Sequence, residues 1–260
     1  NRLVPQMPKG SVLNARILWT FSAAFRFNKN PKHRDLAQRA YHYLRDKFYD
    51  REFGGVFWTV DFAGNPLDTK KQIYAHAFAI YGLSEYYKIS DDREALNLAI
   101  KLFEDIEKYA FDPVNSGYFE AFGRRWEEIP DLRLSEKDAN EKKTMNTHLH
   151  ILEAYTNLYG VWKNDRLAMQ IKNLLSDFRS HFIDKQTHHL VLFMDEKWNS
   201  SRQIYSYGHD IEAAWLLLEA AEALEDQALI EVFKDIALKM ADAATEGIRE
   251  DGSLVYEHDL

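Results

Sequence analysis

Four pairs of apolar segments, each pair followed by a short polar and aromatic stretch, constrain the fold of this chain most strongly. Apolar residues recur every three or four positions, which predicts helices over 11–27, 35–49, 72–87, 92–110, 144–162, 165–183, 207–224 and 229–245. After every second helix comes an excursion with turn and strand signals, marked by Gly55, Gly117, His189 and Gly252. The unit therefore repeats at intervals of roughly 60 to 70 residues.

Helix pairs repeated in this way cannot each bury their own apolar face, so they are expected to stack. The chain is predicted to be all-α with short β-hairpin excursions, arranged either as an open solenoid or as an α/α toroid whose inner helices form a barrel. Because every excursion follows the second helix of a pair, all should gather at one end, where a ligand would bind. A toroid of this class usually closes with about six pairs, and the sequence supplies four.

Composition narrows the class of protein. No Pro/Gly/Ser-rich linker divides the 260 residues, so we expect a single domain over 1–260. A net charge of -8 without a concentrated basic patch argues against a nucleic-acid partner, and the absence of cysteine excludes disulfides and thiolate metal sites. With no apolar signal core and no membrane-length apolar run, we expect a cytoplasmic protein with a trimmed N-terminus, either a monomer or a weak homo-oligomer.

The stretch from Ser206 places a histidine in the first turn of a helix. Ser206 is a good N-cap residue, and His209 and Glu212, three residues apart, share one side of the helix. The field of a helix N-terminus disfavours the imidazolium and keeps the ring neutral near pH 7, the state that a general base requires. The alternative is a structural histidine that caps its own helix.

A second histidine cluster also opens a helix, with Asn146 or Thr147 as the expected cap. Asn146 and His150 are four residues apart and share a face, with Glu153 adjoining. His148 points elsewhere, because residues two apart on a helix diverge by about 200°. His148 and His150 therefore cannot easily grip one ion, and we expect no metal site.

Arg16 stands inside the apolar helix 11–27. Its guanidinium must reach water, meet a carboxylate in a structural ion pair, or contact a bound polar ligand.

The excursions are rich in aromatic residues. Their rings either present faces suited to the C–H faces of sugars or pack the excursions onto the helices. The residues are Phe57, Trp58, Phe62, Tyr118, Phe119, Trp126 and Trp198.

The sequence lacks a dinucleotide-binding glycine motif, a P-loop and a Gly-x-Ser-x-Gly elbow, which removes the commonest nucleotide and serine-hydrolase interpretations. Acidic residues in the excursions, Asp61, Asp112 and Asp195, leave open a glycosidase with paired carboxylates, although nothing in the sequence pairs them.

Four segments, in this order and spacing, resemble one family through essentially the whole chain. They are KGSVLNAR at 9–16, IYAHAFAIYGL at 73–83, NTHLH at 146–150 and SYGHDIE at 206–212. They are similar to the cellobiose 2-epimerases of the N-acylglucosamine 2-epimerase superfamily. The SYGHDIE wording resembles the cellobiose branch more than the N-acetylglucosamine branch.

The resemblance implies an (α/α)6 barrel and inversion at C2 of the reducing-end glucose of cellobiose- or lactose-type β-1,4-disaccharides, without metal or redox cofactor. Ring opening exposes the aldehyde, a neutral histidine removes the C2 proton to give a cis-enediolate, and a second acid/base returns a proton to the other face. It further implies that His209 is one of these two groups, that His150 assists ring opening and proton movement at O1, and that Arg16 stabilises the enediolate. Sugar hydroxyls would be bound, or the imidazoles oriented, by Tyr74, Asn146, Trp198 and Glu212.

One departure from the family pattern concerns the C-terminus. The family has a further segment with two adjacent tryptophans and a third catalytic histidine, whereas this sequence stops at Leu260, and His258 lies in no matching motif. We expect a fragment that lacks about two helix pairs. The alternatives are a short relative that binds sugar without catalysis, an N-acylglucosamine or mannose 2-epimerase or aldose–ketose isomerase, and a helical-toroid glycosidase.

Overall fold

A computed structural model describes residues 4–200 and 204–259. The chain divides into two compact units. The first runs to Phe111 and includes Glu120–Asp138, and the second combines Asp112–Phe119 with the residues from Ala139 onward. Within the described ranges, no helix is long and apolar enough to cross a membrane.

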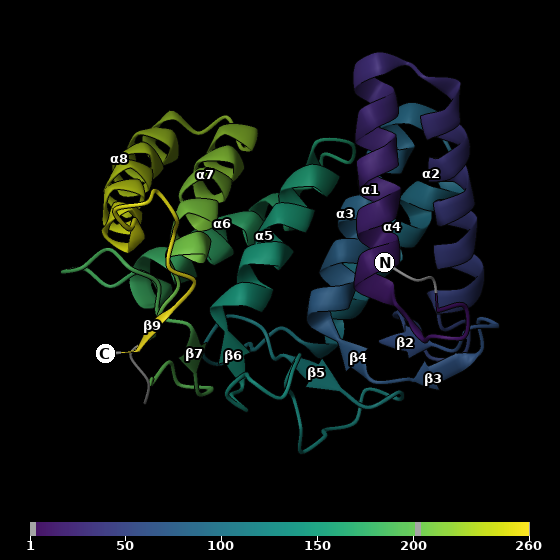
Figure 1. The fold of residues 1–260 in the computed structure, drawn as a ribbon, viewed down its shortest axis with the longest axis horizontal. Helices are drawn as coiled ribbons and strands as arrows, with labels where there is room; N and C mark the ends of the chain where they lie inside the picture. The colour runs from purple at the N-terminus through teal and green to yellow at the C-terminus, as the bar shows by residue number, and fades with distance from the viewer. Residues whose placement is uncertain (1–3, 201–203, 260) are drawn as a thin grey trace. The chain divides into compact units, whose positions relative to one another are not determined.

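The described part of the first unit contains two helix pairs, and α1 packs against both α2 and α3 (Figure 1). Its helical elements are α1 (Ser11–Asn28), α2 (Pro31–Tyr43), the π-helical turn η1 (Leu44–Phe48), α3 (Ile73–Ser90) and α4 (Arg93–Tyr109). Its strands are β1 (Lys9–Gly10), β2 (Thr59–Val60), β3 (Pro66–Asp68), β4 (Lys71–Gln72) and β5 (Ala121–Phe122).

The second unit repeats the plan, with α7 packed along α8 and against α5 (Figure 1). Its helical elements are α5 (Met145–Tyr159), α6 (Asp165–Asp177), the π-helical turn η2 (Phe178–Phe182), α7 (Tyr207–Ala223), α8 (Gln227–Ala244) and the 3₁₀ turn η3 (Thr245–Gly247). Its strands are β6 (Lys143–Thr144), β7 (Phe193–Met194), β8 (Ile204–Tyr205) and β9 (His258–Asp259).

The predicted helices are confirmed, but one start and one capping residue were wrong. The helix expected from 35 begins at Pro31, because Asn30 caps it by accepting the Lys32 N–H at 3.1 Å and proline suits the first helical turn. The cap of α5 is Thr144, whose hydroxyl accepts the Thr147 N–H at 3.2 Å, not Asn146 or Thr147.

Close packing between α1 and α3 explains the small residues of α3. A Cβ added to Gly82 would lie 2.7 Å from the Ala15 carbonyl oxygen, so the two helix backbones approach too closely for a side chain there. Ala75, Ala77 and Ala79 are fully buried on the same helix. Small side chains thus let α3 pack on several sides at once.

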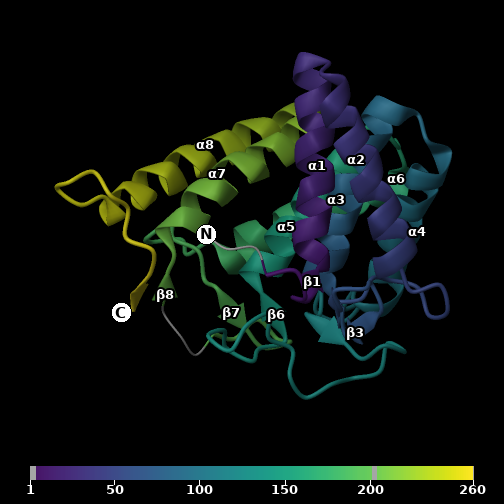
Figure 2. The ribbon, with the colours of Figure 1, turned by 45° about the vertical axis from the view of Figure 1, so that its right-hand side comes forward.

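Each excursion returns to the helix pair that it follows. The strand just before α1 pairs antiparallel with β2, and β4–β5, β6–β7 and β8–β9 repeat this relationship for α3, α5 and α7. Within each unit, the excursions consequently lie at the end where the odd-numbered helices begin (Figure 2). For each unit taken by itself, this confirms the predicted clustering at one end.

A buried ion pair fixes the first part of each of two excursions to the next helix pair. Nζ of Lys71 lies 3.0 Å from Oδ2 of Asp50, and Nζ of Lys143 lies 2.9 Å from Oδ2 of Asp112. Each lysine also donates to a backbone carbonyl of its excursion, at 2.7 Å and 2.6 Å. Because the four side chains are closed to solvent, each charge depends on its partner.

A buried histidine stands five residues after each of these lysines. Nε2 of His76 accepts the Val56 N–H at 3.1 Å, and Nε2 of His148 accepts the Tyr118 N–H at 2.8 Å. Their Nδ1 atoms lie 2.8 Å and 2.7 Å from the carbonyl four residues earlier. Burial lowers the pKa of both imidazoles to about 3, so both remain neutral and hold the excursions.

A tryptophan and a glycine complete each of these assemblies. The indole N–H groups of Trp126 and Trp198 donate to excursion carbonyls at 2.8 Å and 2.7 Å. A Cβ on Gly55 would lie 2.3 Å from Nε2 of His76, and one on Gly117 would lie 2.6 Å from the Trp198 ring, so both positions require glycine. We call each set of aspartate, lysine, histidine, tryptophan and glycine a polar lock.

Candidate active site

His209 occupies the first turn of α7, as predicted. Ser206 stands at the N-cap position, but the prediction that its hydroxyl caps the backbone was wrong, because Oγ lies 2.7 Å from Nδ1 of His209 instead. The Ser206 hydroxyl can accept from Nδ1–H, and in that tautomer Nε2 carries the lone pair. No described residue hydrogen-bonds to Nε2, so this tautomer presents a basic nitrogen.

Electrostatics keep that nitrogen unprotonated. Burial is the largest influence and lowers the pKa of His209. The Glu212 carboxylate, one turn further along α7, works in the opposite direction, and the charge of a protonated His150 would lower the pKa further. His209 is thus neutral near pH 7 and lies within electrostatic reach of the second predicted histidine.

His150 on α5 is 4% exposed and is paired as predicted. Its Nδ1 lies 2.8 Å from Oε2 of Glu153, one turn later on the same helix. A carboxylate accepting from Nδ1–H fixes both the orientation and the tautomer of an imidazole. His148, in contrast, belongs to a polar lock, which confirms that the two histidines diverge.

Asn146, one turn before His150 on α5, carries an unsatisfied acceptor. Its Oδ1 is buried and receives no hydrogen bond from the described residues. A buried carbonyl oxygen without a donor costs about 1–3 kcal/mol, so a ligand hydroxyl that donates to it would be favoured.

The first unit contains Arg16 and Tyr74. Arg16 is exposed, makes no ion pair with a described residue, and holds its guanidinium carbon 4.4 Å from the centre of the Phe78 ring. The Tyr74 ring meets Phe78 edge-on, with centroids 4.9 Å apart. Of the environments considered for Arg16, the structure shows an exposed guanidinium above an aromatic ring, not a structural ion pair.

The repeat places several of these groups at one equivalent position. The sixth residue of α1, α3, α5 and α7 is Arg16, Phe78, His150 and Glu212, respectively. The starts predicted from the sequence for α3 and α5, 72 and 144, lie one residue before the observed ones, so this equivalence emerges only when the observed starts are aligned.

Trp198 is already engaged within its polar lock. Its ring stacks on His181 with centroids 4.4 Å apart, and Nζ of Lys143 lies 4.3 Å from its centroid. Its N–H donates to the Asn115 carbonyl. Trp126 is its counterpart in the first unit, stacked on Tyr109 at 4.4 Å. The sugar-binding role inferred for Trp198 stays a prediction.

The other aromatic and acidic residues singled out in the excursions have structural contacts. Phe57 and Tyr118 are buried, which favours packing over ligand contact for these two aromatics. Asp61 and Asp195 accept hydrogen bonds from their own turns, and Asp112 is paired with Lys143, so these carboxylates are engaged separately. No group of three or more His, Asp or Glu side chains among the described residues is arranged to hold a metal ion.

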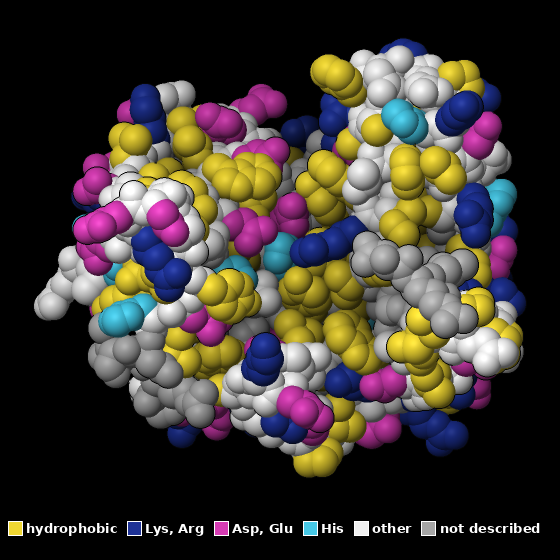
Figure 3. Space-filling view, viewed as in Figure 1, with side chains coloured by type: hydrophobic (Ala, Val, Ile, Leu, Met, Phe, Trp, Pro, Cys, Tyr) yellow, Lys and Arg dark blue, Asp and Glu magenta, His cyan; other side chains and the backbone are white. Residues whose placement is uncertain are grey.

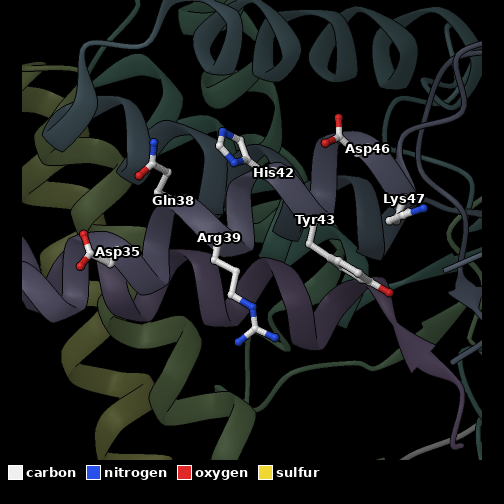
Figure 4. A pocket seen from close by; sticks show the side chains of 7 residues that line it. All are labelled: Asp35, Gln38, Arg39, His42, Tyr43, Asp46 and Lys47. Atoms are coloured by element: carbon white, nitrogen blue, oxygen red, sulfur yellow. The ribbon is translucent and has the colours of Figure 1, made fainter. Parts of the chain in front are cut away.

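One pocket on the surface of the first unit lies apart from the candidate site residues. A pocket of about 510 Å³ runs along α2 and η1, lined by polar side chains that include Asp35, Arg39 and His42 (Figure 4). Because one continuous helical stretch supplies its lining, it is a groove on the surface of that stretch. On the face in Figure 3, acidic and basic side chains of the described residues are interspersed.

Comparison with known proteins gives the relatives. The family model for N-acylglucosamine 2-epimerase (GlcNAc 2-epimerase) matches residues 2–260. A cellobiose 2-epimerase of Bacteroides fragilis is 56% identical over 99% of this chain, and one of Ruminococcus albus is 43% identical over 96%. The chain spans 66% and 64% of the lengths of these two relatives.

The solved structures agree with the predicted fold class. The structure of cellobiose 2-epimerase from Bacillus thermoamylovorans superimposes with a TM-score of 0.95 at 39% identity, covering 99% of this chain and 66% of that one. Such structures are (α/α)6 barrels, which confirms the all-α toroid class over the open solenoid. Because the family model matches nearly the whole length of this chain, the chain belongs to the N-acylglucosamine 2-epimerase family.

Proposed function

We propose that the full-length protein is a carbohydrate epimerase that inverts C2 of the reducing-end glucose of cellobiose- or lactose-type β-1,4-disaccharides. The observation that carries the proposal is His209, a neutral imidazole whose Nε2 is unpartnered among the described residues. The relatives of this chain that are named cellobiose 2-epimerase support the substrate class.

The proposed reaction begins with opening of the sugar ring. The C1 aldehyde of the open form acidifies the C2 hydrogen, and Nε2 of His209 takes that proton to leave a cis-enediolate. His150, oriented by Glu153, moves the proton at O1 during ring opening and closure. A general base of this kind contributes about 10²- to 10⁴-fold to the rate.

The enediolate oxygens need a positive partner, and we assign this role to Arg16. Its guanidinium is exposed, and no described carboxylate neutralises it. Inversion further requires a second acid/base group that returns the proton to the opposite face of C2. We propose that it comes from the part of the full-length protein outside these 260 residues.

Four residues are proposed to bind sugar hydroxyls or to orient the imidazoles. Asn146 has the strongest support, because a hydroxyl would satisfy its buried Oδ1. Glu212 is supported by its electrostatic interaction with His209. Tyr74 and Trp198 rest on the family resemblance.

The test is NMR of cellobiose incubated with the full-length protein in D2O. We expect a product with a mannose-configured reducing end that carries deuterium at C2. Absence of both product and exchange would contradict the proposal. Parallel incubations with mannose and N-acetylglucosamine would reveal a monosaccharide epimerase or isomerase, and release of glucose from cellobiose would reveal a glycosidase.

A further inference from the structure

Among its described residues, the third excursion has no polar lock like those of the first two and carries a different set of contacts at the equivalent place. The acceptor for the excursion N–H is Asp210 here, where the earlier locks use His76 and His148. Its Oδ1 accepts the Leu190 N–H at 2.9 Å. Tyr205, five residues before it, stands where the other locks place a buried lysine.

His189 takes the position that glycine holds in the earlier locks. There, imidazole and indole fill the space that a side chain would need. In the third excursion the shorter Asp210 leaves room, and the His189 ring fills it, stacked on Tyr205 with centroids 4.1 Å apart. Its Nδ1 lies 2.7 Å from Oδ2 of Asp210, and both side chains are at most 1% exposed.

This pair is tied directly to the first turn of α7. The Asp210 N–H donates to the Ser206 carbonyl at 3.0 Å, while the Ser206 hydroxyl holds Nδ1 of His209. The residue before the lock acceptor is Ala75 in the first lock and Thr147 in the second. In the third it is His209, so the device that fixes Asp210 also fixes the proposed base.

We infer that His189 and Asp210 form a positioning pair that sets the place of the His209 imidazole. The inference rests on the proposed function for its kinetic consequence, but not for its structural one. Asp210 uses one carboxylate oxygen on the excursion backbone and the other on His189, so α7 cannot shift or rotate at its start without breaking a buried hydrogen bond.

The contacts of the His189 side chain determine which substitutions test this inference. Tyr205 and Tyr207 pack against its ring, Asp210 accepts at Nδ1, and the largely exposed Glu246 carboxylate lies 3.4 Å from Nε2. His189→Phe keeps a ring against both tyrosines and removes the N–H donor. Asp210→Asn keeps an oxygen acceptor for Leu190 and weakens the bond to His189.

Ser116→Ala supplies the matched control. It removes a hydrogen bond of 2.9 Å to Asp177, at the residue just before Gly117 of the second polar lock and in the same unit, without touching α7. It reports what the loss of one excursion hydrogen bond does by itself.

The first measurement is the titration of His209, followed by NMR of ¹³C-labelled histidine in the full-length protein and assigned through His209→Asn. We expect His189→Phe to change the His209 shift and to raise its pKa, because a loosened first turn is less buried. Asp210→Asn also removes a charge that raises the pKa of His209, so its titration combines this lowering with the raising effect of a less buried turn, and His189→Phe is the variant that decides the direction. Ser116→Ala should leave the titration unchanged. Identical His209 titrations in all four proteins would overturn the inference, whether or not cellobiose is epimerised.

The second measurement is kinetic. We expect His189→Phe to lower kcat on cellobiose by about 10- to 100-fold, as a misplaced catalytic group does, with less than about a 3-fold change in KM. An unchanged kcat in a folded His189→Phe protein would contradict the inference. A wild-type protein that epimerises no sugar would instead contradict the proposed function, and the titration would still decide on the positioning pair.

Discussion

Lys71 and Asp50 form an ion pair closed to solvent on both sides, with Nζ and Oδ2 3.0 Å apart. Burial by itself would raise the pKa of Asp50, but hydrogen bonds from Arg124 and Lys71 outweigh it and hold the pKa below its usual value. Asp112, the counterpart of Asp50 in the second lock, has one cationic partner among the described residues, Lys143. The two locks should therefore respond differently when the lysine is lost.

Replacing each lysine by methionine tests this difference. Lys143→Met leaves Asp112 as a buried charge without a cation and should cost about 3–5 kcal/mol of the free energy of unfolding. Lys71→Met should cost less, about 1–3 kcal/mol, because Arg124 still neutralises Asp50 at 2.9 Å. Urea unfolding of both variants measures the difference, and equal losses would contradict the assigned role of Arg124.

The glycines of the locks should not tolerate alanine. Gly55→Ala places a Cβ 2.3 Å from Nε2 of His76 and also meets a positive φ of 70°, so we expect a loss above about 2 kcal/mol. Gly252→Ala is the control, because φ there is 79° but nothing lies within 4 Å of the added Cβ. It should lose only about 1 kcal/mol. Equal losses in thermal unfolding would show that the backbone conformation alone matters.

Asp177 makes stability depend on pH. Burial raises its pKa to about 6, above the ordinary value of 3.8, although Ser116 donates to it. The folded state therefore holds the proton more tightly than the unfolded state, so this contribution to stability is complete below about pH 4 and disappears as pH rises to about 6. In Asp177→Asn this loss should be absent, and the wild-type protein should lose up to about 3 kcal/mol relative to the variant between pH 4 and pH 7.

Chemical denaturation at several pH values measures that difference. Because both proteins share the other titrating groups, the difference isolates Asp177. A constant difference across this range would contradict the raised pKa.

Trp198 and Trp126 allow the inferred sugar contact to be separated from the lock. Replacing either by phenylalanine removes one indole hydrogen bond to an excursion carbonyl, so both variants should lose about 1 kcal/mol of stability. If Trp198 also binds sugar, Trp198→Phe should raise KM for cellobiose several-fold more than Trp126→Phe. Steady-state kinetics beside urea unfolding makes the comparison, and equal KM values would restrict Trp198 to the lock.

The Glu212 carboxylate should influence the pH at which kcat/KM falls on the acidic side. Its carboxylate raises the pKa of His209 against the lowering effect of burial, so Glu212→Gln should lower that pKa further. His209 would then remain a neutral base at lower pH, and the acid limb of kcat/KM should move to lower pH. Glu222→Gln, further along α7, is the control and should leave the limb in place. A limb that moves equally in both variants would contradict a local effect of Glu212.

The sequence by itself determined the helix pairs, their order, and the neighbours one turn apart. His209 in the first turn of α7 and Glu153 beside His150 follow from helical periodicity, because residues three or four apart share a face. The repeat and four motifs also sufficed to indicate the family.

Only the tertiary structure decided what fixes these groups in place. Lys71 meets Asp50 across 21 residues, Trp198 meets Asn115 across 83, and His189 meets Asp210 across 21, so no local pattern pairs them. The Ser206 hydroxyl was available to either the backbone or His209, and the built first turn gives it to the imidazole. Periodicity specifies which face of a helix is buried, whereas a buried polar group takes whichever partner the packed chain brings within reach.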